Sequence, residues 1–234
     1  MRLNIVDPYL PKLASIEKKI HKSLKSGLVT NNSGNLVLFE KELKKFFKSK
    51  YVPVVFCNGE MALYSLIYAW KTKLGFKLNQ KIKALVPSFT FVGTINALYL
   101  NNIEPVFCDI DETLTLDLKS IKKIDKSIKL ILPVSVYGNI IDIHKVKKFC
   151  RKNKINCIVD SAPAFGSKFN GKYINNLGID EIYSFHVTKI FNSIEGGVAI
   201  TNNKSIHKTL KNLRNFGQSE KQTGDVLVPG LNSK

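Results

Sequence analysis

The sequence predicts an α/β protein of three layers, in which helices cover both faces of a mostly parallel β-sheet. Two observations predict this class. Short, continuous apolar runs, typical of strands buried on both faces, recur from residue 52 onward. Between them lie longer segments in which apolar side chains return at helical spacing. Strands that alternate with helices of this length indicate βαβ units, whose strands run parallel.

Two amphipathic helices precede this alternation. Residues 10–27 alternate apolar and basic side chains at helical spacing, and Gly27 provides the stop signal. A loop is expected at residues 31–35, and residues 36–50 then form the second amphipathic helix. This N-terminal segment comes before the first predicted strand.

Strands and helices then alternate to residue 217. The expected strands are residues 52–57, 83–88, 104–110, 128–136, 155–161, 181–186 and 197–202. The expected helices are residues 59–75, 91–102, 115–124, 142–153 and 204–217. The first of these helices closes at Gly75, and the third begins behind a threonine or aspartate cap.

Two further segments do not fit the alternation. Residues 164–174 resemble a turn between two short strands, and residues 223–234 form no complete element. A chain of 234 residues can bury a substantial core, so one large domain, or one domain and a fragment of another, is expected.

Composition narrows the cellular setting. No apolar run approaches the roughly 20 residues needed to span a bilayer, and the N-terminus lacks the pattern of a signal peptide. We therefore expect a cytoplasmic protein without membrane contact. Cys57, Cys108, Cys150 and Cys157 show no C-x-x-C spacing and three of them lie in or beside apolar runs. They are interpreted as buried free thiols rather than metal ligands, and no metal is predicted.

The net charge of +18 raises the question of nucleic-acid binding. Arg2, Arg151 and Arg214 are the only arginines among 36 basic residues, although arginine is the preferred residue for bidentate recognition of bases and phosphates. The lysines are spread over many predicted helices rather than gathered in one arm. The scarcity of arginine and the spread of the lysines therefore disfavour a nucleic-acid partner. The positive charge is compatible with attraction of anionic small substrates.

Polar or unusual side chains follow several predicted strands where each strand ends. They are Asn58, Gly59, Glu60, Phe91, Asp160, Ser184, His186 and Lys189. Each of these residues also has a purely structural interpretation, as part of a turn, a helix cap, a core aromatic or a buried histidine. For any one residue alone, the structural interpretation is preferred over a functional one. Ligands of open α/β sheets bind beyond the carboxyl ends of the strands. The recurrence of these residues at one edge of one sheet therefore favours a binding site.

Asp160 and Lys189 are the informative pair. A carboxylate at a strand end and a lysine one short strand later could share a cleft. Lysine forms Schiff bases when its ammonium group can lose a proton, and a pyridoxal cofactor also needs a carboxylate beside its ring nitrogen. Backbone N–H groups of a helix beginning near Gly59 would suit the phosphate of such a cofactor.

These residues lie in motifs that resemble the sugar-nucleotide aminotransferases of the DegT/DnrJ/EryC1/StrS family. The motifs follow the family's order over nearly the whole chain: FEKELKKFF, CNGEMAL, VPSFTFVGTINALYLNNIEPVFCDID, PVSVYGN, VDSAPAFGSKFNGKYINNLG, YSFHVTKIFNSIEGGVAIT, LRNFGQ and PGLNSK. The resemblance implies a pyridoxal-phosphate enzyme whose large domain has the aspartate-aminotransferase fold, called fold type I.

The resemblance also implies residue roles around the cofactor ring. Lys189 matches the lysine that forms the Schiff base, and Asp160 matches the aspartate that binds the pyridine nitrogen. Phe91 matches the aromatic residue stacked on the ring, and Ala162 would pack on the opposite face.

Four further residues match the family's phosphate site. Gly59 and Glu60 occupy the phosphate-binding turn, and Ser184 matches a serine that also binds the phosphate. Asn232 matches an asparagine that reaches the phosphate of the neighbouring subunit, which implies a homodimer with active sites at its interface.

The chain departs from the family pattern at three places. Glu60 replaces a hydroxyl residue, so its backbone N–H is expected to bind the phosphate while the carboxylate turns away. Pro163 replaces a glutamine that contacts the ring hydroxyl of the cofactor. Family members continue beyond the PGLNSK motif into a smaller C-terminal domain. Residues 1–234 are therefore interpreted as the N-terminal segment plus the large, cofactor-binding domain.

The activity that the resemblance implies is amino transfer, with glutamate as the usual donor, to a nucleotide-linked keto-sugar. The motifs resemble members that make 4-amino-4,6-dideoxy sugars for surface polysaccharides such as lipopolysaccharide. Two alternatives stay open. One is a pyridoxamine-dependent sugar dehydratase, although those members carry histidine in place of Lys189. The other is an inactive or partner-dependent fragment.

Overall fold

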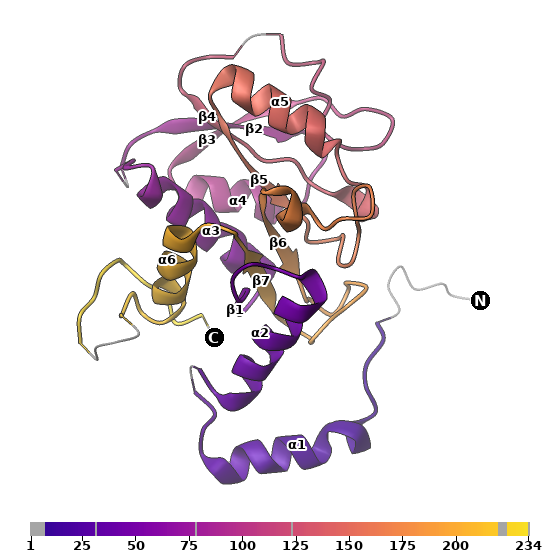
Figure 1. Ribbon diagram of the computed structural model, residues 1–234, viewed down its shortest axis with the longest axis vertical. Coiled ribbons are helices and arrows are strands. Elements are labelled where there is room, and N and C mark those ends of the chain that lie inside the picture. The colour runs from indigo at the N-terminus through magenta and orange to yellow at the C-terminus, as the bar shows by residue number, and fades with distance from the viewer. Residues whose placement is uncertain (1–7, 31, 78, 123, 220–223, 234) are drawn as a thin grey trace.

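A computed structural model describes residues 8–30, 32–77, 79–122, 124–219 and 224–233. Figure 1 shows a twisted sheet in the middle of the molecule with helices on both faces. The strands are β1 (Val54–Phe56), β2 (Ile82–Pro87), β3 (Ile103–Cys108), β4 (Ile128–Ile131), β5 (Asn156–Asp160), β6 (Asp180–Ser184) and β7 (Gly197–Ile200). The helices are α1 (Leu13–Ser26), α2 (Gly34–Phe47), α3 (Gly59–Lys73), α4 (Val92–Leu100), α5 (Ile143–Asn153) and α6 (Lys204–Arg214), with 3-10 turns at Val136–Gly138 and Ile174–Leu177.

The seven strands form one sheet in the order β1-β7-β6-β5-β4-β2-β3. Strands β6, β5, β4, β2 and β3 pair in parallel, whereas β7 is antiparallel to both of its neighbours, β1 and β6. The start of β7 therefore lies at the same edge as the carboxyl ends of the other strands. The predicted fold class, a mostly parallel α/β sheet, is confirmed.

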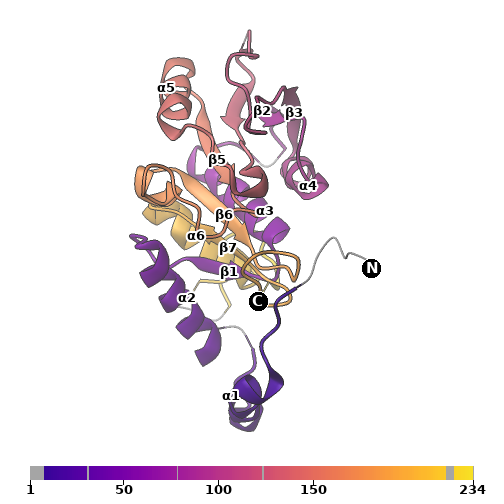
Figure 2. The same cartoon turned by 90° about the vertical axis from the view of Figure 1, so that its right-hand side faces the viewer.

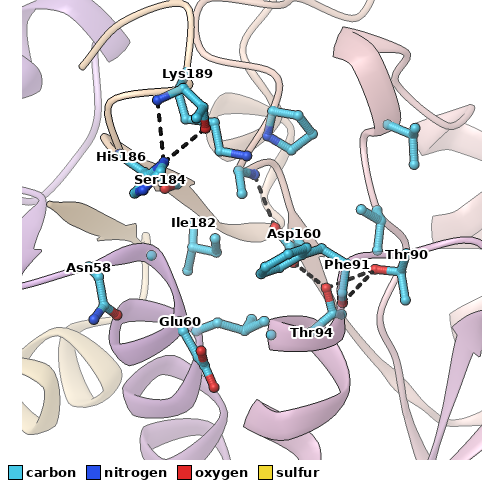
Figure 3. Close-up of a pocket in the computed structure, with 18 of the residues that line it drawn as sticks. Asn58, Glu60, Thr90, Phe91, Thr94, Asp160, Ile182, Ser184, His186 and Lys189 are labelled. Carbon is cyan, nitrogen blue, oxygen red and sulfur yellow. Dashed lines mark hydrogen bonds between the residues drawn. The ribbon is translucent and has the colours of Figure 1, made fainter. Parts of the chain in front are cut away.

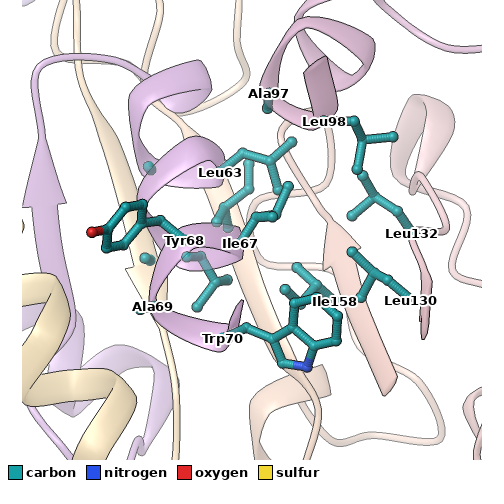
Figure 4. Close-up of a cluster of buried hydrophobic side chains, with 14 of the residues drawn as sticks. Leu63, Ile67, Tyr68, Ala69, Trp70, Ala97, Leu98, Leu130, Leu132 and Ile158 are labelled. Atoms are coloured by element: carbon teal, nitrogen blue, oxygen red, sulfur yellow. The ribbon is translucent and has the colours of Figure 1, made fainter. Parts of the chain in front are cut away.

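The strands bury side chains on both faces because consecutive residues point to opposite sides. In β5, Ile158 packs with the cluster under α3, α4 and α6, while its neighbour Val159 packs with the cluster under α5. Figure 4 shows Leu63, Ile67 and Trp70 of α3 at the centre of the first cluster. A third cluster joins α2 to the far side of β6 and β7. These clusters complete the three layers.

Helix α1 differs from the other helices, because none of its residues is buried. Figures 1 and 2 both show it at one end of the molecule, apart from the sheet. It ends as predicted at Gly27, which has a left-handed backbone with φ of 67° and whose N–H donates to the carbonyl of Leu24. Its apolar side chains Leu13, Ile20 and Leu24 are therefore exposed.

The helix predicted at residues 115–124 is wrong. The described residues in this range, 115–122 and 124, form turns and one isolated β-bridge between Leu116 and Ile110. The Asp117 side chain accepts a hydrogen bond from the N–H of Lys119, which favours a turn over a helix. Leu116 is buried with the cluster under α5, so its burial explains the apolar signal.

Other boundaries shift by a few residues. The strand predicted at 128–136 ends at Ile131, because Pro133 has no N–H with which to continue the ladder. The turn predicted within residues 164–174 is present, with Phe169 and Lys172 bridged across Asn170 and Gly171. All four cysteines are free thiols, although of the four only Cys108 is fully buried. No helix among the described residues is long and apolar enough to cross a membrane.

Candidate active site

One edge of the sheet carries a cavity of about 710 Å³. It lies beyond the carboxyl ends of β1, β2, β5 and β6, the place that the strand order favours for a ligand. Of the predicted site residues, seven line it: Gly59, Glu60, Phe91, Asp160, Ala162, Ser184 and Lys189. Figure 3 shows Lys189 on one side of the cavity and Asp160, Phe91 and Thr94 on the other. The eighth, Asn232, does not line it.

The N-terminus of α3 forms one wall. Asn58 caps the helix, its side-chain oxygen accepting from the N–H of Met61 at 2.8 Å. The first N–H groups of the helix have no partner within it and carry the positive end of its dipole, which suits an anion. A Cβ on Gly59 would lie 2.8 Å from the Cβ of Ser184, so only glycine lets β6 and α3 approach this closely. Gly59 and Ser184 are therefore neighbours, as a shared phosphate site requires.

Gly197 at the start of β7 packs closely against the same turn before α3. A Cβ there would lie 2.3 Å from the carbonyl oxygen of Asn58. Any side chain at this position would push β7 away from the start of α3. The two glycines together hold the helix terminus against the sheet edge.

The Glu60 carboxylate points toward α4. Figure 3 shows it directed away from Lys189, and its Oε2 atom would lie 3.4 Å from a Cβ on Gly93. A carboxylate in the first turn of a helix interacts favourably with the helix dipole. The side chain thus leaves the backbone N–H groups of the α3 terminus facing the cavity.

Asp160 at the end of β5 is 5% exposed and is held by two donors. The hydroxyl of Thr94 donates to Oδ2 at 2.7 Å, and the N–H of Ala162 donates to Oδ1 at 3.0 Å. Burial raises the pKa of Asp160 above its ordinary value, while the Ala162 N–H, the Thr94 hydroxyl and the charge of Lys189 act to lower that pKa. The carboxyl is therefore fixed in position and feels the lysine across the cavity.

Lys189 lies in the connection between β6 and β7, and its N–H donates to the carbonyl of His186 at 2.9 Å. The structural interpretation of His186 as a buried histidine is wrong, because its side chain is 43% exposed and lines the cavity. Its ring contacts the Thr188 hydroxyl at 2.8 Å and the Glu195 carboxylate at 3.5 Å. The lysine thus stands on a partly exposed loop that these contacts shape.

Phe91 and Ala162 bring apolar surface to the cavity. Phe91 precedes α4 and is 77% exposed, so its ring is accessible from the cavity that it lines. Ala162 follows Asp160 and is half-buried, and Pro163 beside it also lines the cavity. The stacking roles expected of Phe91 and Ala162 stay predictions.

Asn232 is exposed and lies outside the cavity. It forms an isolated β-bridge with Asn215, just beyond α6. The next residue, Ser233, is buried, and its hydroxyl accepts from the N–H of Cys57 at 3.3 Å, immediately before the α3 cap. Within one chain Asn232 therefore does not contribute to this cavity, and its proposed role toward a neighbouring subunit stays a prediction.

The sequence reading missed some cavity residues. Thr90 lies two residues before α4 and Thr94 in its first turn, and both line the cavity. Tyr137 also lines the cavity, with a left-handed backbone at φ of 53°. Its neighbour Gly138 was the only local sequence signal for such a turn.

The cavity residues fit pyridoxal phosphate. A lysine and a buried, hydrogen-bonded carboxyl face one space, an exposed aromatic ring flanks it, and a helix N-terminus without bulky side chains opens into it. These are the groups that such a cofactor needs for its aldehyde, its ring nitrogen, its ring face and its phosphate.

Fold and site together define a class: fold type I of the pyridoxal-phosphate-dependent aminotransferases. The structure of Helicobacter pylori PseC, "aminotransferase involved in the biosynthesis of pseudoaminic acid", matches with a TM-score of 0.87 at 27% identity, over 99% of this chain and 61% of that one. DesI, solved "in the presence of its TDP-sugar product", matches with a TM-score of 0.85 at 25% identity, over 97% and 55% of the two chains.

The chain belongs to the DegT/DnrJ/EryC1/StrS aminotransferase family, whose sequence profile matches residues 13–234. It is 31% identical to GDP-perosamine synthase of Vibrio cholerae, over 91% of this chain and 57% of that protein. It is 30% identical to dTDP-4-amino-4,6-dideoxy-D-glucose transaminase of Shigella dysenteriae, over 98% and 60%. The chain therefore spans less than two thirds of the length of these relatives.

Proposed function

We propose that this protein transfers an amino group, from glutamate or a similar donor, to a nucleotide-linked keto-sugar. The observation that carries the proposal is the placement of Lys189, Asp160 and the α3 N-terminus around one cavity. The relatives support the substrate class, since their names describe a GDP-linked and a dTDP-linked amino sugar. The second of these names describes a 4-amino sugar, and we include in the proposal a role in making such sugars for surface polysaccharides.

Pyridoxal phosphate, when bound, supplies an electron sink that stabilises negative charge on a substrate carbon. Lys189 would hold the cofactor covalently through Nζ and, once released, would move a proton at the reacting carbon as general base and acid. Asp160 would keep the ring nitrogen protonated. The N–H groups of Gly59 and Glu60 and the hydroxyl of Ser184 would hold the phosphate.

Lys189 also bears on the alternatives. A lysine rather than a histidine at this position favours amino transfer over pyridoxamine-dependent dehydration. A partner-dependent or inactive chain is the alternative that the trapping experiment below tests against this proposal. The interpretation of residues 1–234 as an N-terminal segment plus the large domain belongs to this proposal.

We further infer a homodimer. Asn232 is exposed, it does not line its own cavity, and Ser233 beside it is anchored at the start of α3. This position suits a side chain that reaches a neighbouring subunit's phosphate. We expect such a dimer to work in the cytoplasm.

The test is covalent trapping. The purified chain is incubated with pyridoxal 5′-phosphate, reduced with borohydride, and the modified lysine is mapped by mass spectrometry. Dominant labelling at Lys189 is expected. Lys71 is an internal control, because burial lowers its pKa, yet it lies outside the cavity with Nζ bonded to the carbonyl of Asn101 at 2.6 Å. Scattered labelling over surface lysines would contradict the proposal and favour the partner-dependent alternative.

A further inference from the structure

Two threonine hydroxyls form a chain that ends on Asp160. The hydroxyl of Thr90 donates to Oγ1 of Thr94 at 2.8 Å, and the hydroxyl of Thr94 donates to Oδ2 of Asp160 at 2.7 Å. Thr94 is 2% exposed, whereas Thr90 is half-buried in the connection from β2 to α4. Figure 3 shows both bonds on the Asp160 side of the cavity.

The charge of Asp160 sets the direction of this chain. An ionised carboxylate can only accept hydrogen bonds, and a threonine hydroxyl has a single proton to donate. When Asp160 is ionised, Thr94 must therefore donate to it, which leaves the Thr94 oxygen free to accept from Thr90. Aligned donors strengthen one another, so Thr90 supports the bond from Thr94.

Each carboxylate oxygen of Asp160 thus receives one fixed donor, Thr94 on Oδ2 and the Ala162 N–H on Oδ1. The first donor comes from a helix and the second from the backbone beyond β5, so the carboxyl plane is held from two sides. Hydrogen bonds to the charged form of a buried acid favour that form. Without the Thr94 hydroxyl, one oxygen of a carboxyl that is only 5% exposed would lose its fixed donor.

We propose that Thr94 is a positioning residue, which, with Thr90 behind it, holds the Asp160 carboxylate charged and oriented toward the ring nitrogen of the cofactor. This inference rests on the proposed function. It assigns to the start of α4 a role beyond that of Phe91, because this one short segment carries both the exposed ring and the hydroxyls that orient the carboxylate.

A structural role and a positioning role predict different pH behaviour. A threonine that only fills space would change cofactor affinity equally at every pH. A threonine that favours the charged form of Asp160 would matter most on acidification, where that form is lost. The other titratable side chains lining the cavity, among the described residues, are Glu60, Tyr137, His186, Lys189 and Glu195. These side chains are the same in the wild type and the variants. The difference between their curves of cofactor affinity against pH therefore reports on Asp160.

The experiment measures binding of pyridoxal 5′-phosphate to the full chain by equilibrium dialysis between pH 5 and 8. Thr94→Val removes the hydroxyl and keeps the shape, and Thr94→Ser keeps the hydroxyl. Thr90→Val removes the second donor. Thr201→Val is the matched control, because Thr201 is 3% exposed and its hydroxyl bonds the carboxyl of Asp180, outside the cavity.

We expect Thr94→Val to weaken binding about tenfold at neutral pH, the effect of one hydrogen bond to a charged group. The pH at which binding weakens on acidification should also rise. Thr94→Ser should stay within about twofold of wild type, and Thr90→Val should lose about threefold. Thr201→Val should leave both affinity and pH dependence unchanged.

Several results would overturn the inference. One is wild-type affinity and pH dependence in Thr94→Val. Another is a loss that is equal at every pH and that Thr94→Ser does not restore. If Thr94→Val does not fold, the test falls to Thr90→Val, because Thr90 is only half-buried. Wild-type weakening of cofactor binding on acidification in Thr90→Val would then overturn the inference. Failure of the wild-type chain to bind the cofactor would overturn the proposed function as well.

Discussion

The two sides of the cavity are built differently. Asp160 ends a central strand, is almost fully buried and receives two fixed hydrogen bonds. Lys189 stands on the β6–β7 connection, where its neighbours Thr188 and Ile190 are exposed and His186 is half-exposed. A group that stabilises charge works best when fixed and shielded from water, whereas a lysine that binds and releases a partner must move. The difference in packing therefore matches the two proposed roles.

The largest effect that this comparison predicts is a loss of amino transfer on removal of the Lys189 side chain, with no change in the stability of the fold. Lys189→Ala should lower amino transfer by on the order of a thousandfold or more, because among the described residues no other lysine lines the cavity. Since the side chain is partly exposed, the urea unfolding midpoint should stay at its wild-type value. Single-turnover assays and unfolding curves check both parts. Measurable turnover near the wild-type rate would remove Lys189 from the mechanism.

Asp160→Ala should affect function and stability together. Removing one partner of a buried, hydrogen-bonded charge pair should weaken pyridoxal phosphate binding about a hundredfold. The orphaned hydroxyl of Thr94 and N–H of Ala162 should lower the free energy of unfolding by about 1–3 kcal/mol. Equilibrium dialysis and urea titration measure the two effects. Normal cofactor affinity would place Asp160 outside the site.

Glu181 provides a second buried carboxyl for comparison, one strand away and facing the other side of the sheet. It accepts from the N–H of Asn175 at 2.9 Å and from the hydroxyls of Ser161 and Tyr183 at 3.2 and 2.8 Å. Burial nevertheless raises the pKa of Glu181 to about 7 from an ordinary 4.5. The folded protein therefore holds a proton there that the unfolded chain has already released between these pH values.

This proton makes stability depend on pH. The contribution of Glu181 is fully present below pH 4.5 and is lost as pH rises through about 7, a change of about 3 kcal/mol. Glu181→Gln should match wild type at pH 4 and exceed its unfolding free energy at pH 8. Urea unfolding at both pH values measures this, with the histidines and the buried carboxyls of Asp160 and Asp180 common to both proteins. Parallel curves would contradict the assignment.

The smallest effect belongs to the loop side. The ion pair between His186 and Glu195 is 3.5 Å long with side chains 43% and 59% exposed, so water screens it. Glu195→Gln should change the free energy of unfolding by less than about 0.5 kcal/mol. Chemical unfolding at pH 6 measures it. A loss of several kcal/mol would mean that the loop is as firmly held as the Asp160 side.

Much of the fold follows from local patterns. Apolar runs predicted the seven strands, and Gly27 and the cap at Asn58 mark real helix ends. The helix predicted at 115–124 failed because Leu116 is buried through a bridge to Ile110, a contact that helical spacing cannot distinguish from a helix face. The site was predictable where residues follow strand ends, as with Asp160, but not at Thr94, which looks like any threonine in a helix.

By itself the sequence determined the family, the α/β class and the seven predicted residues that line the cavity, because these depend on short motifs and on where strands end. Only the tertiary structure decided three other features. The antiparallel β7 brings Gly197 next to the α3 cap. The Glu60 carboxylate, which was expected to turn away from the phosphate site, has α4 as its neighbour, and Thr94, bonded in turn by Thr90, reaches Asp160. The reason is physical: each of these contacts joins residues distant in the chain, or depends on which neighbour a side chain meets, and neither is encoded in local periodicity.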